Sequence, residues 1–595
     1  MRAVEAFPNL VSLFFARAEE QRDRPFLSRK VDGHWQSMSW AEVARQVASL
    51  ATALQAQGVR PGETVMLVCE NRPEFCIADL AIMAVGAISV PTYTTNTTRD
   101  HAHILTDSGA SAVIVSTAKL AKTLMPAVLR SHARLVISIE EIGTAQTDAI
   151  RFERWYKLIA EHPAEPTDIV ARCNAGRDDI ACIIYTSGTG GAPRGVMQHH
   201  GAILHNVEGC VDVIVHDFEP NEDIFLSFLP LSHAYEHSGG QFLPIGLGAQ
   251  IYYSEGLDKL ASNIEEVRPT IIVVVPRLFE VLRTRIIKAI EKQGTLARLL
   301  LDQALRVGGR EQAGASRPWD KVLRALLNRT IVPRVQQRFG GRIKALVSGG
   351  APLNPEVGSF FQSLGLTLLQ GYGQTEAGPV ISVNRPAAGI AMGTVGPPLK
   401  NTQVRIAQDG EILVAGPLVM KGYWRNPKET EAALRDGWLY TGDIGEFDEK
   451  GRIRITDRKK DLIVNDKGDN IAPQKVEGML TLQDEIAQAM VVGDRRPWLV
   501  GLIVPDAEWM RRWASANRTS GDLTNLRDNP TFHLALRGAI DRVNRELSVT
   551  EKVRQFILAD EPFTVENEML TPSMKIRRHA IKAAYQARLD ALYKV

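Results

Sequence analysis

The chain has 595 residues, of which 45% are hydrophobic and 23% are charged. This composition excludes a wholly disordered or fibrous protein, and the length predicts roughly two to four folding units. Lys and Arg number 70 against 68 Asp and Glu, so the net charge of +2 gives no general argument for nucleic-acid binding.

The first residues, MRAVEAFPNLVSLFFARAEE, predict an amphipathic helix that begins at Pro8–Asn9 rather than a signal peptide. No apolar run reaches the ~18 residues of a spanning helix. The five cysteines form no CxxC pair and no zinc-type cluster with histidine. We therefore expect a cytoplasmic protein with reduced thiols, the alternative being a peripheral position on the inner face of the membrane.

Helices and short apolar strands alternate over the first 270 residues. Residues 41–59 and 75–87 have helical patterns, and residues 63–70 and 111–116 read as buried strands. The most β-branched run, residues 271–275, predicts another buried strand. This alternation is typical of α/β layers with a largely parallel sheet.

Residues 283–342 carry an unusual charge, with 14 Lys or Arg against 4 Asp or Glu, a net +10. Their pattern is helical, and we expect a break at GGREQAGAS, residues 308–316. One interpretation is a solvated helical hairpin. The other is a patch that faces anionic lipid or an anionic ligand such as a nucleotide phosphate.

The pattern changes near residues 390–456, where short strands over 393–406, 410–416 and 451–458 predict a small antiparallel β unit. A new series of strands and helices starts after the charged segment DRKKDLI, residues 457–463. We therefore expect an N-terminal domain over residues 1–458 and a C-terminal domain over residues 459–595.

A loop rich in Thr, Ser and Gly follows the apolar strand that ends at Tyr185, in ACIIYTSGTGGAPRGV. Its N–H and hydroxyl groups can surround phosphate oxygens, although the GK[ST] ending of a Walker loop is missing. In GYGQTEAGP, residues 371–379, Tyr372 can stack on a base and Glu376 can hold Mg²⁺, although a surface Glu is commoner than a ligand residue. In YTGDIG, Asp443 can accept from ribose hydroxyls, but a turn-capping Asp is the commoner explanation.

Together these segments resemble the adenylate-forming superfamily of acyl-CoA synthetases, luciferases and peptide-synthetase adenylation domains. Seven motifs occur in the family's order between residues 185 and 578: YTSGTGGAPRG, LPLSHAYEH, VSGGAPL, GYGQTE, YTGDIG, DRKKDLI and LTPSMKIRR. VPRLFEVL, NDKGDNIAPQKVE and ENEMLTPSMKIRR are most similar to long-chain fatty acyl-CoA synthetases of the AMP-forming type. The resemblance implies a large N-terminal domain of layered α/β sheets with a small β-barrel-like unit, followed by a small mobile α+β domain.

The resemblance also implies site residues. Lys575, Glu376, His233 and Thr186 would be catalytic, with Glu376 as the Mg²⁺ ligand, Lys460 as the hinge, and His233 as a gate or polar contact more than a base. The nucleotide would contact Thr186, Ser187, Gly188, Thr189, Gly190, Gly191, Arg194, Gly349, Gly350, Ala351, Gly371, Tyr372, Gly373, Thr375, Asp443, Arg458 and Lys460.

The implied reaction joins a long-chain fatty acid to CoA with ATP, through an acyl-adenylate, and releases AMP and pyrophosphate. Two positions depart from the family's TSGTTG and PKG: Gly190 lacks a hydroxyl, and Arg194 presents a planar fork. Alternatives are a fatty acyl-AMP ligase that loads a carrier protein, a ligase for another hydrophobic acid, and a membrane-associated fatty-acid uptake protein of weak activity. The resemblance also leaves a homodimer open.

Overall fold

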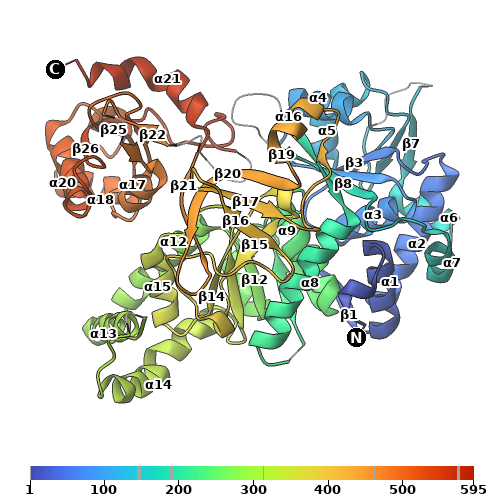
Figure 1. Cartoon of the computed structure of the whole chain (residues 1–595), viewed down its shortest axis with the longest axis horizontal. Coiled ribbons are helices and arrows are strands. Elements are labelled where there is room, and N and C mark those ends of the chain that lie inside the picture. The colour runs from blue at the N-terminus through green and yellow to red at the C-terminus, as the bar shows by residue number, and fades with distance from the viewer. Residues whose placement is uncertain are drawn as a thin grey trace. The chain divides into compact units, whose positions relative to one another are not determined.

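The computed structural model describes residues 2–143, 149–186, 193–220, 222–312, 314–459, 462–467, 469–571 and 576–594. The chain divides into two compact units (Figure 1). The first comprises residues 1–405, 413–441 and 447–454, and the second comprises residues 406–412, 442–446 and 455–595. The predicted boundary between residues 458 and 459 stays a prediction.

The first unit contains two eight-stranded sheets that are mainly parallel, as the alternating pattern predicts. One sheet has the order β15-β14-β13-β12-β10-β11-β1-β2. Its strands are β1 (Pro25–Val31), β2 (His34–Ser39), β10 (Ile224–Ser227), β11 (Gln250–Tyr253), β12 (Ile271–Val274), β13 (Ala345–Ser348), β14 (Leu368–Gly373) and β15 (Val380–Val383).

The other sheet has the order β18-β9-β8-β4-β3-β5-β6-β7. Its strands are β3 (Thr64–Val68), β4 (Ile88–Thr92), β5 (Ala112–Val115), β6 (Leu135–Ser138), β7 (Arg151–Arg154), β8 (Ile180–Thr186), β9 (Arg194–His199) and β18 (Gly422–Tyr423).

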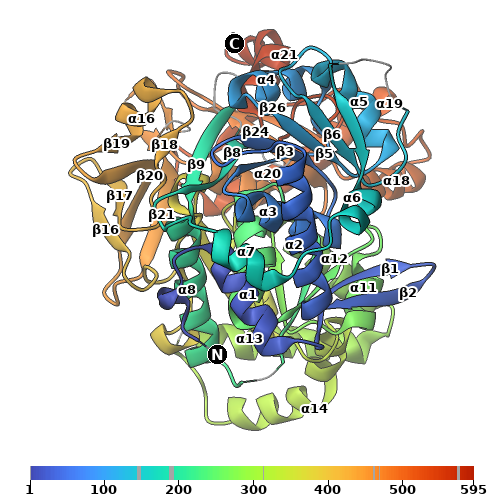
Figure 2. The same ribbon diagram turned by 90° about the vertical axis from the view of Figure 1, so that its right-hand side faces the viewer.

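Helices cover these sheets (Figure 2). They are α1 (Leu10–Gln21), α2 (Trp40–Ala56), α3 (Pro73–Ala84), α4 (Thr98–Ser108), α5 (Ala118–Val128), α6 (Trp155–Glu161), α7 (Pro166–Arg172), α8 (His200–Asp217), α9 (Ala234–Glu236), α10 (Leu243–Leu247), α11 (Leu260–Val267), α12 (Pro276–Glu291), α13 (Thr295–Gln312), α14 (Asp320–Arg338), α15 (Pro355–Ser363) and α16 (Pro427–Ala433). Short helical turns are η1 (Val4–Ala6), the π-helical η2 (His237–Phe242), η3 (Thr375–Ala377) and η4 (Pro386–Ala388).

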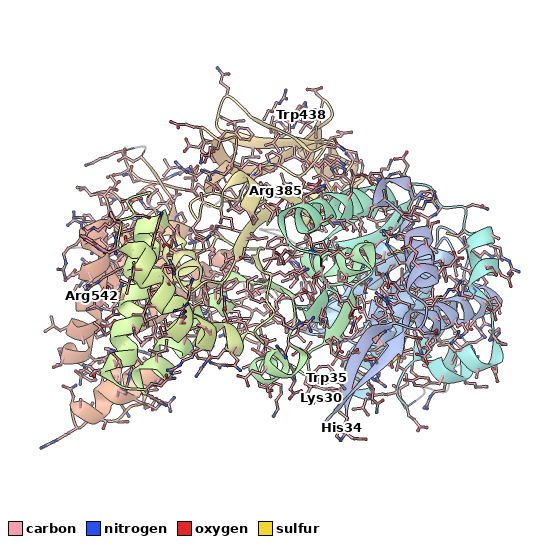
Figure 3. All side chains as sticks on the ribbon, turned by 90° about the horizontal axis from the view of Figure 1, so that it is seen from below. Lys30, His34, Trp35, Arg385, Trp438 and Arg542 are labelled. Carbon is pink, nitrogen blue, oxygen red and sulfur yellow. The ribbon has the colours of Figure 1, made fainter. Side chains whose placement is uncertain are left out.

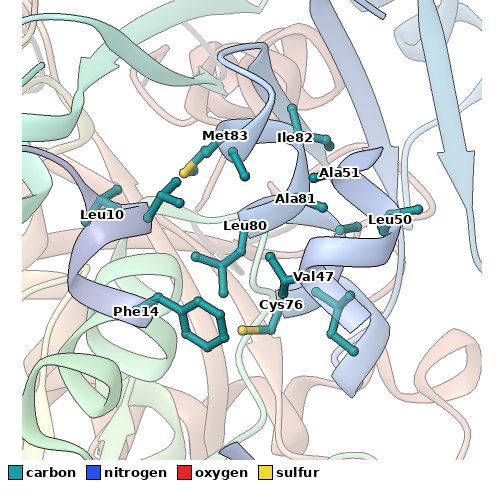
Figure 4. Packing of buried hydrophobic residues seen from close by; sticks show 14 of the residues in the cluster. Leu10, Phe14, Val47, Leu50, Ala51, Cys76, Leu80, Ala81, Ile82 and Met83 are labelled. Carbon is teal, nitrogen blue, oxygen red and sulfur yellow. The ribbon is translucent and has the colours of Figure 1, made fainter. Parts of the chain in front are cut away.

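The main core of the first unit lies where α1, α2 and α3 pack together, as Figure 4 shows with Phe14, Val47, Cys76 and Leu80. α1 begins as predicted, because the Asn9 side chain accepts a hydrogen bond from the Ser12 amide at 2.7 Å and so caps the helix. All residues of α3 are buried, including Glu74 and Asp79, and the remaining side chains are apolar, which is why this helix lacks a polar face.

The β1–β2 hairpin forms one edge of the first sheet, and Figure 3 labels Lys30 and Trp35 on this hairpin. The Lys30 ammonium and the Trp35 indole each donate at 2.8 Å to the carboxylate of Glu266 on α11. These bonds tie the polar hairpin to a neighbouring helix.

The predicted small β unit is a five-stranded sheet of β16 (Gln403–Ile406), β17 (Glu411–Ala415), β19 (Leu434–Arg435), β20 (Trp438–Phe447) and β21 (Ile453–Arg458). The strand expected over 393–406 starts only at Gln403, because Pro397 and Pro398 offer no N–H for a ladder.

The second unit contains a two-stranded sheet, a three-stranded sheet of order β24-β25-β26, and helices. Its elements beyond residue 459 are β22 (Ile463–Val464), β23 (Asn470–Ile471), α17 (Pro473–Leu480), β24 (Ile486–Val492), β25 (Leu499–Pro505), α18 (Ala507–Ala516), α19 (Leu523–Leu526), α20 (Pro530–Glu546), β26 (Val553–Leu558) and α21 (Arg578–Ala591). The mixed α/β class and the presence of a large N-terminal and a small C-terminal part agree with the prediction.

The basic segment forms helices as predicted, and α13 runs through Gly308 and Gly309 and ends at Gln312, within the predicted break over residues 308–316. A Cβ on Gly308 would lie 2.1 Å from the Ser363 hydroxyl, so this glycine lets α13 approach α15 closely. Among the described residues, no helix is both long and apolar enough to cross a membrane.

Candidate functional site

Four parallel strands of the first sheet, β10, β12, β13 and β14, end at the same edge of the sheet. Ligands of α/β proteins bind outside the carboxyl ends of parallel strands. The predicted residues His233, Gly349, Gly350 and Glu376 all follow such an end, so the sheet brings three of the motifs to one edge.

Two of these motifs are in direct contact. The Tyr235 hydroxyl donates to the Val347 carbonyl at 3.0 Å, and a Cβ on Gly349 would lie 2.7 Å from the Tyr235 ring. Gly349 therefore has to be glycine for the tyrosine to lie there, and Gly350 follows with a φ of +80°, which favours glycine again. Ala351 comes next on this loop, where the adenine pocket is predicted.

The end of β14 carries the GYGQTE motif. Gly373 needs to lack a side chain, because a Cβ there would lie 1.9 Å from the Pro379 carbonyl oxygen. Tyr372 is 8% exposed and Thr375 is buried, and the Thr375 carbonyl accepts from the Gln198 amide at 2.8 Å. This bond links η3 to β9 of the other sheet, whereas the contact of Tyr372 with a base stays a prediction.

Glu376 is half-buried and held in place. The Tyr423 hydroxyl donates to its Oε1 at 2.8 Å, and its carbonyl accepts from the Met420 amide at 3.0 Å. Burial and the nearby carboxylate raise the pKa of the Tyr423 hydroxyl, so it stays a donor. No group of three or more His, Cys, Asp or Glu side chains that could hold a metal occurs in the described ranges.

A single anchored carboxylate fits Mg²⁺, which is usually bound through one or two carboxylates together with substrate phosphate oxygens.

Arg194 extends this arrangement. Its guanidinium carbon lies 4.4 Å from the centre of the Tyr423 ring, and its Nη1 donates to Glu429 Oε2 at 2.6 Å. The position that departs from the family pattern thus packs on the tyrosine that holds Glu376. A lysine would supply neither the flat stacking surface nor the fork.

Thr186 is the last residue of β8 and pairs in register with Arg194, so both flank the predicted phosphate loop. At the end of that loop the Pro193 carbonyl is hydrogen-bonded to His103 Nε2 at 2.9 Å. The other predicted loop residues, Ser187, Gly188, Thr189, Gly190 and Gly191, lie outside the described residues.

His233 caps α9, and its Nδ1 accepts from the Tyr235 amide at 3.2 Å. A neutral imidazole that accepts at Nδ1 carries its proton on Nε2. In this arrangement Nε2 is a donor. This suits a role of His233 as a polar contact better than a role as a general base.

The predicted ribose residues belong to the second unit. There, Arg458 Nε lies 3.4 Å from Asp443 Oδ1. Lys459 donates at 2.9 Å to Glu411, whose Oε1 accepts from the Gly442 amide at 2.8 Å. Lys460 and Lys575 lie outside the described residues, so their predicted roles as hinge and catalytic lysine remain predictions.

Sequence analysis missed the buried polar contacts made by the last two residues of the LPLSHAYEH motif, Glu236 and His237. His237 Nε2 lies 2.8 Å from Asp79 Oδ2 with both side chains fully buried, and Gln241 donates to the same oxygen at 2.8 Å. The Ser227 hydroxyl donates to Glu236 at 2.7 Å, and burial raises the pKa of Glu236 to about 8. These contacts fix the π-helical turn η2 that follows His233.

Tyr423 and Glu429 were also missed, and nothing in their local sequence marks them, because each contacts a residue that is far away in the chain. Tyr235 lies in the LPLSHAYEH motif, but its contact with Val347 was not predicted.

Comparison with known proteins gives consistent results. The profile of the AMP-binding enzyme family matches residues 14–424, and the profile of the AMP-binding enzyme C-terminal domain matches residues 460–595. The chain is 31% identical to the long-chain-fatty-acid–CoA ligase FadD15 of Mycobacterium tuberculosis, over 98% of this chain and 97% of that protein. It is 30% identical to the long-chain-fatty-acid–CoA ligase 1 of Homo sapiens, over 95% and 84% of the two chains.

Solved structures with the same fold include the adenylation domain of a carboxylate reductase from Mycobacterium chelonae. The TM-score is 0.76 and the identity 22%, over 99% of this chain and 91% of that chain. The anthranilate CoA ligase AuaEII in complex with anthranoyl-AMP matches with a TM-score of 0.73 and 19% identity, over 99% of both chains.

Proposed function

Because the chain belongs to the AMP-binding enzymes, we propose that it is a long-chain fatty acid–CoA ligase that converts ATP, a fatty acid and CoA into acyl-CoA, AMP and pyrophosphate. The observation that carries the proposal is the 31% identity to a protein of that name over 98% of this chain. The anchored Glu376 at the carboxyl edge of the sheet supports it.

The chemistry has two steps. A carboxylate is a poor electrophile, so its oxygen first bonds to the α-phosphorus of ATP while the bond from that phosphorus to pyrophosphate breaks. The CoA thiolate then bonds to the acyl carbon, and AMP leaves. The first step brings two anions together, and fixed positive charge around the phosphorus lowers its barrier.

Glu376 is the residue that we expect to hold Mg²⁺, which would neutralise phosphate charge when bound. Tyr423 keeps the Glu376 carboxylate in place through its hydroxyl, and Arg194 keeps the Tyr423 ring in place. Positioning of this kind contributes to catalysis because the groups need no reorganisation during the reaction.

We further propose that Lys575 and Lys460 act as the catalytic lysine and the hinge of a C-terminal domain that rotates between the two steps. The proposed boundary between residues 458 and 459 places both in that domain. Asp443 and Arg458, which lie together in the second unit, would bind the ribose.

We also propose a cytoplasmic protein whose residues 283–342 contact anionic membrane. All four acidic side chains of this segment are engaged by three arginines: Glu291 and Asp302 by Arg298, Asp320 by Arg310, and Glu311 by Arg324. The surplus of basic residues is therefore not offset by free acids within the segment. A homodimer is a proposal that rests on the family resemblance alone.

The deciding experiment measures AMP and CoA-thioester formation by the full chain with fatty acids of increasing length. A long-chain ligase should form both products and prefer the longer acids. Formation of acyl-AMP without any CoA-thioester would favour an acyl-AMP ligase that loads a carrier protein. Absence of AMP with every acid would contradict the proposal and favour a binding protein.

A further inference from the structure

A cavity of about 290 Å³ lies between α12, α13 and α14. Its floor is formed by Ile286 and Ile290 of α12 and by Ile331 and Val335 of α14, all of them buried. Gln293 and Thr330 also line the cavity, but most of its lining is apolar, which favours an alkyl chain over a polar ligand.

The mouth of the cavity is basic. Arg334 and Arg338 line it, and both are exposed side chains one helical turn apart, on the same side of α14. Arg334 Nη1 donates to Gln293 Oε1 at 3.4 Å, across the gap to the end of α12. An apolar interior with two cations at its rim is complementary to an anionic amphiphile.

The surface beside the cavity is apolar as well as basic. In Figures 1 and 2, α14 lies at the periphery of the first unit with α13 next to it. Large apolar side chains are exposed on both helices and at Trp319, the residue before α14: Leu296 is 70% exposed, Leu299 54%, Trp319 63%, Val322 73% and Leu326 51%. Apolar and cationic side chains presented together are typical of a surface that lies on an anionic bilayer.

The cavity is remote from the proposed reaction site. Pro276 begins α12 at the carboxyl end of β12, whereas Ile290 lies fourteen residues further along the helix. At the rise of an α-helix this separation is about 20 Å. A head group held between Arg334 and Arg338 would therefore lie away from the edge of the sheet where the carboxyl group of the acid would react.

We propose that this cavity binds one acyl chain of an anionic phospholipid while the protein lies on a bilayer, with the lipid phosphate between Arg334 and Arg338. The proposal rests on the membrane contact proposed above and gives it a defined site. Leu296 and the exposed side chains of α13 and α14 would enter the surrounding lipid.

The test measures sedimentation of the full chain with vesicles of phosphatidylcholine, alone or mixed with phosphatidylglycerol, without ATP. Arg334→Gln/Arg338→Gln should weaken binding to the mixed vesicles by about 30-fold, as expected for two basic groups at an anionic surface. Lys119→Gln/Lys122→Gln removes the same charge from exposed positions on α5 and should leave binding unchanged. An equal loss in both variants would overturn a defined site.

A second measurement uses phosphatidylglycerol with a photoreactive group at the end of one acyl chain. Crosslinks to Ile286 or Ile290 are expected, and Ala297→Phe, which narrows the cavity, should reduce them in a chain of unchanged thermal stability. Crosslinks confined to Val322 and Leu326 would mean surface contact only. Crosslinking by a photoreactive free fatty acid but not by the phospholipid would also overturn the proposal.

Adenylate formation from a water-soluble fatty acid is followed in the same variants and should equal that of the parent protein. Loss of vesicle binding with normal adenylate formation separates this site from the proposed reaction. Normal vesicle binding in a chain that forms no acyl-AMP would contradict the proposed function and leave the lipid site standing.

Discussion

At the scale of single residues, the most informative contact is the hydrogen bond from the Tyr423 hydroxyl to Glu376, because it fixes a carboxylate that would otherwise have several rotamers. We expect Glu376→Gln to lower adenylate formation by at least about 10²-fold, since it removes the anion for Mg²⁺ and keeps the shape. Tyr423→Phe should lower it by about tenfold, because the carboxylate stays but is no longer held.

Pyrophosphate exchange into ATP, measured with saturating fatty acid, checks both variants. Unchanged exchange in Glu376→Gln would remove Glu376 from the mechanism. If both variants lost the same fraction of pyrophosphate exchange, the position of the Glu376 carboxylate would matter more than its charge.

The buried Glu236 predicts a pH dependence of stability. Its pKa of about 8 lies above the ordinary value of 4.5, so between these values the folded state keeps a proton that the unfolded state has released. Its contribution to stability is complete below about pH 4.5 and is lost as the pH rises through about 8, with a slope of up to about 1.4 kcal/mol per pH unit.

Glu236→Gln cannot ionise, so it should gain stability relative to the parent protein as the pH rises from about 5 to about 8. Thermal unfolding followed by tryptophan fluorescence at several pH values gives the comparison. Two curves that stay parallel over this range would show that Glu236 does not titrate there.

At the scale of elements, the π-helical turn η2 depends on a buried pair that joins it to α3. Removing one partner of a buried pair leaves the other unpaired, which costs about 3–5 kcal/mol. Asp79→Ala and His237→Ala should each destabilise the chain by roughly this amount. The double variant should lose less unfolding free energy than the two single variants together, with a coupling of about 1–3 kcal/mol.

Urea unfolding of the four proteins measures this cycle, with Asp79→Asn as the control that keeps the shape and one oxygen acceptor. Additive losses would mean that the Asp79–His237 contact contributes little by itself. The turn would then be held mainly by burial of its own apolar side chain, Phe242.

Some structural features were predictable from the sequence and others were not. The strand β12 and the helix start at Asn9 were predictable because local patterns determine them. The contacts of Glu376 with Tyr423 and of Arg194 with Glu429 span 47 and 235 residues, so no local pattern contains them. The end of α13 within residues 308–316 was predictable, but the close approach of Ser363 to Gly308 was not, because Ser363 belongs to another helix.

At the scale of the whole molecule, the proposed rotation of the C-terminal domain predicts that the two half-reactions can be separated. Lys575→Ala should lower acyl-AMP formation by about 10²-fold or more, because an ammonium beside the attacked phosphate is lost. The same variant should convert supplied acyl-AMP and CoA to thioester almost normally.

Lys460→Pro should have the opposite bias, because fixing φ at the hinge hinders rotation more than the starting arrangement. Both half-reactions are measured separately on both variants. If Lys575→Ala slows the two steps equally, Lys575 is structural and the rotation account fails.

The ion pairs inside the basic segment have a consequence for handling the protein. Its pI is about 8.2 and its net charge is only +2, so net charge by itself would predict little retention on an ion-exchange column near pH 8. However, eleven of the fourteen cations in residues 283–342 are arginines, which stay charged at any working pH, and the four acids there are already paired. A sulfonate resin should therefore retain this nearly neutral protein by one face and release it when salt is added.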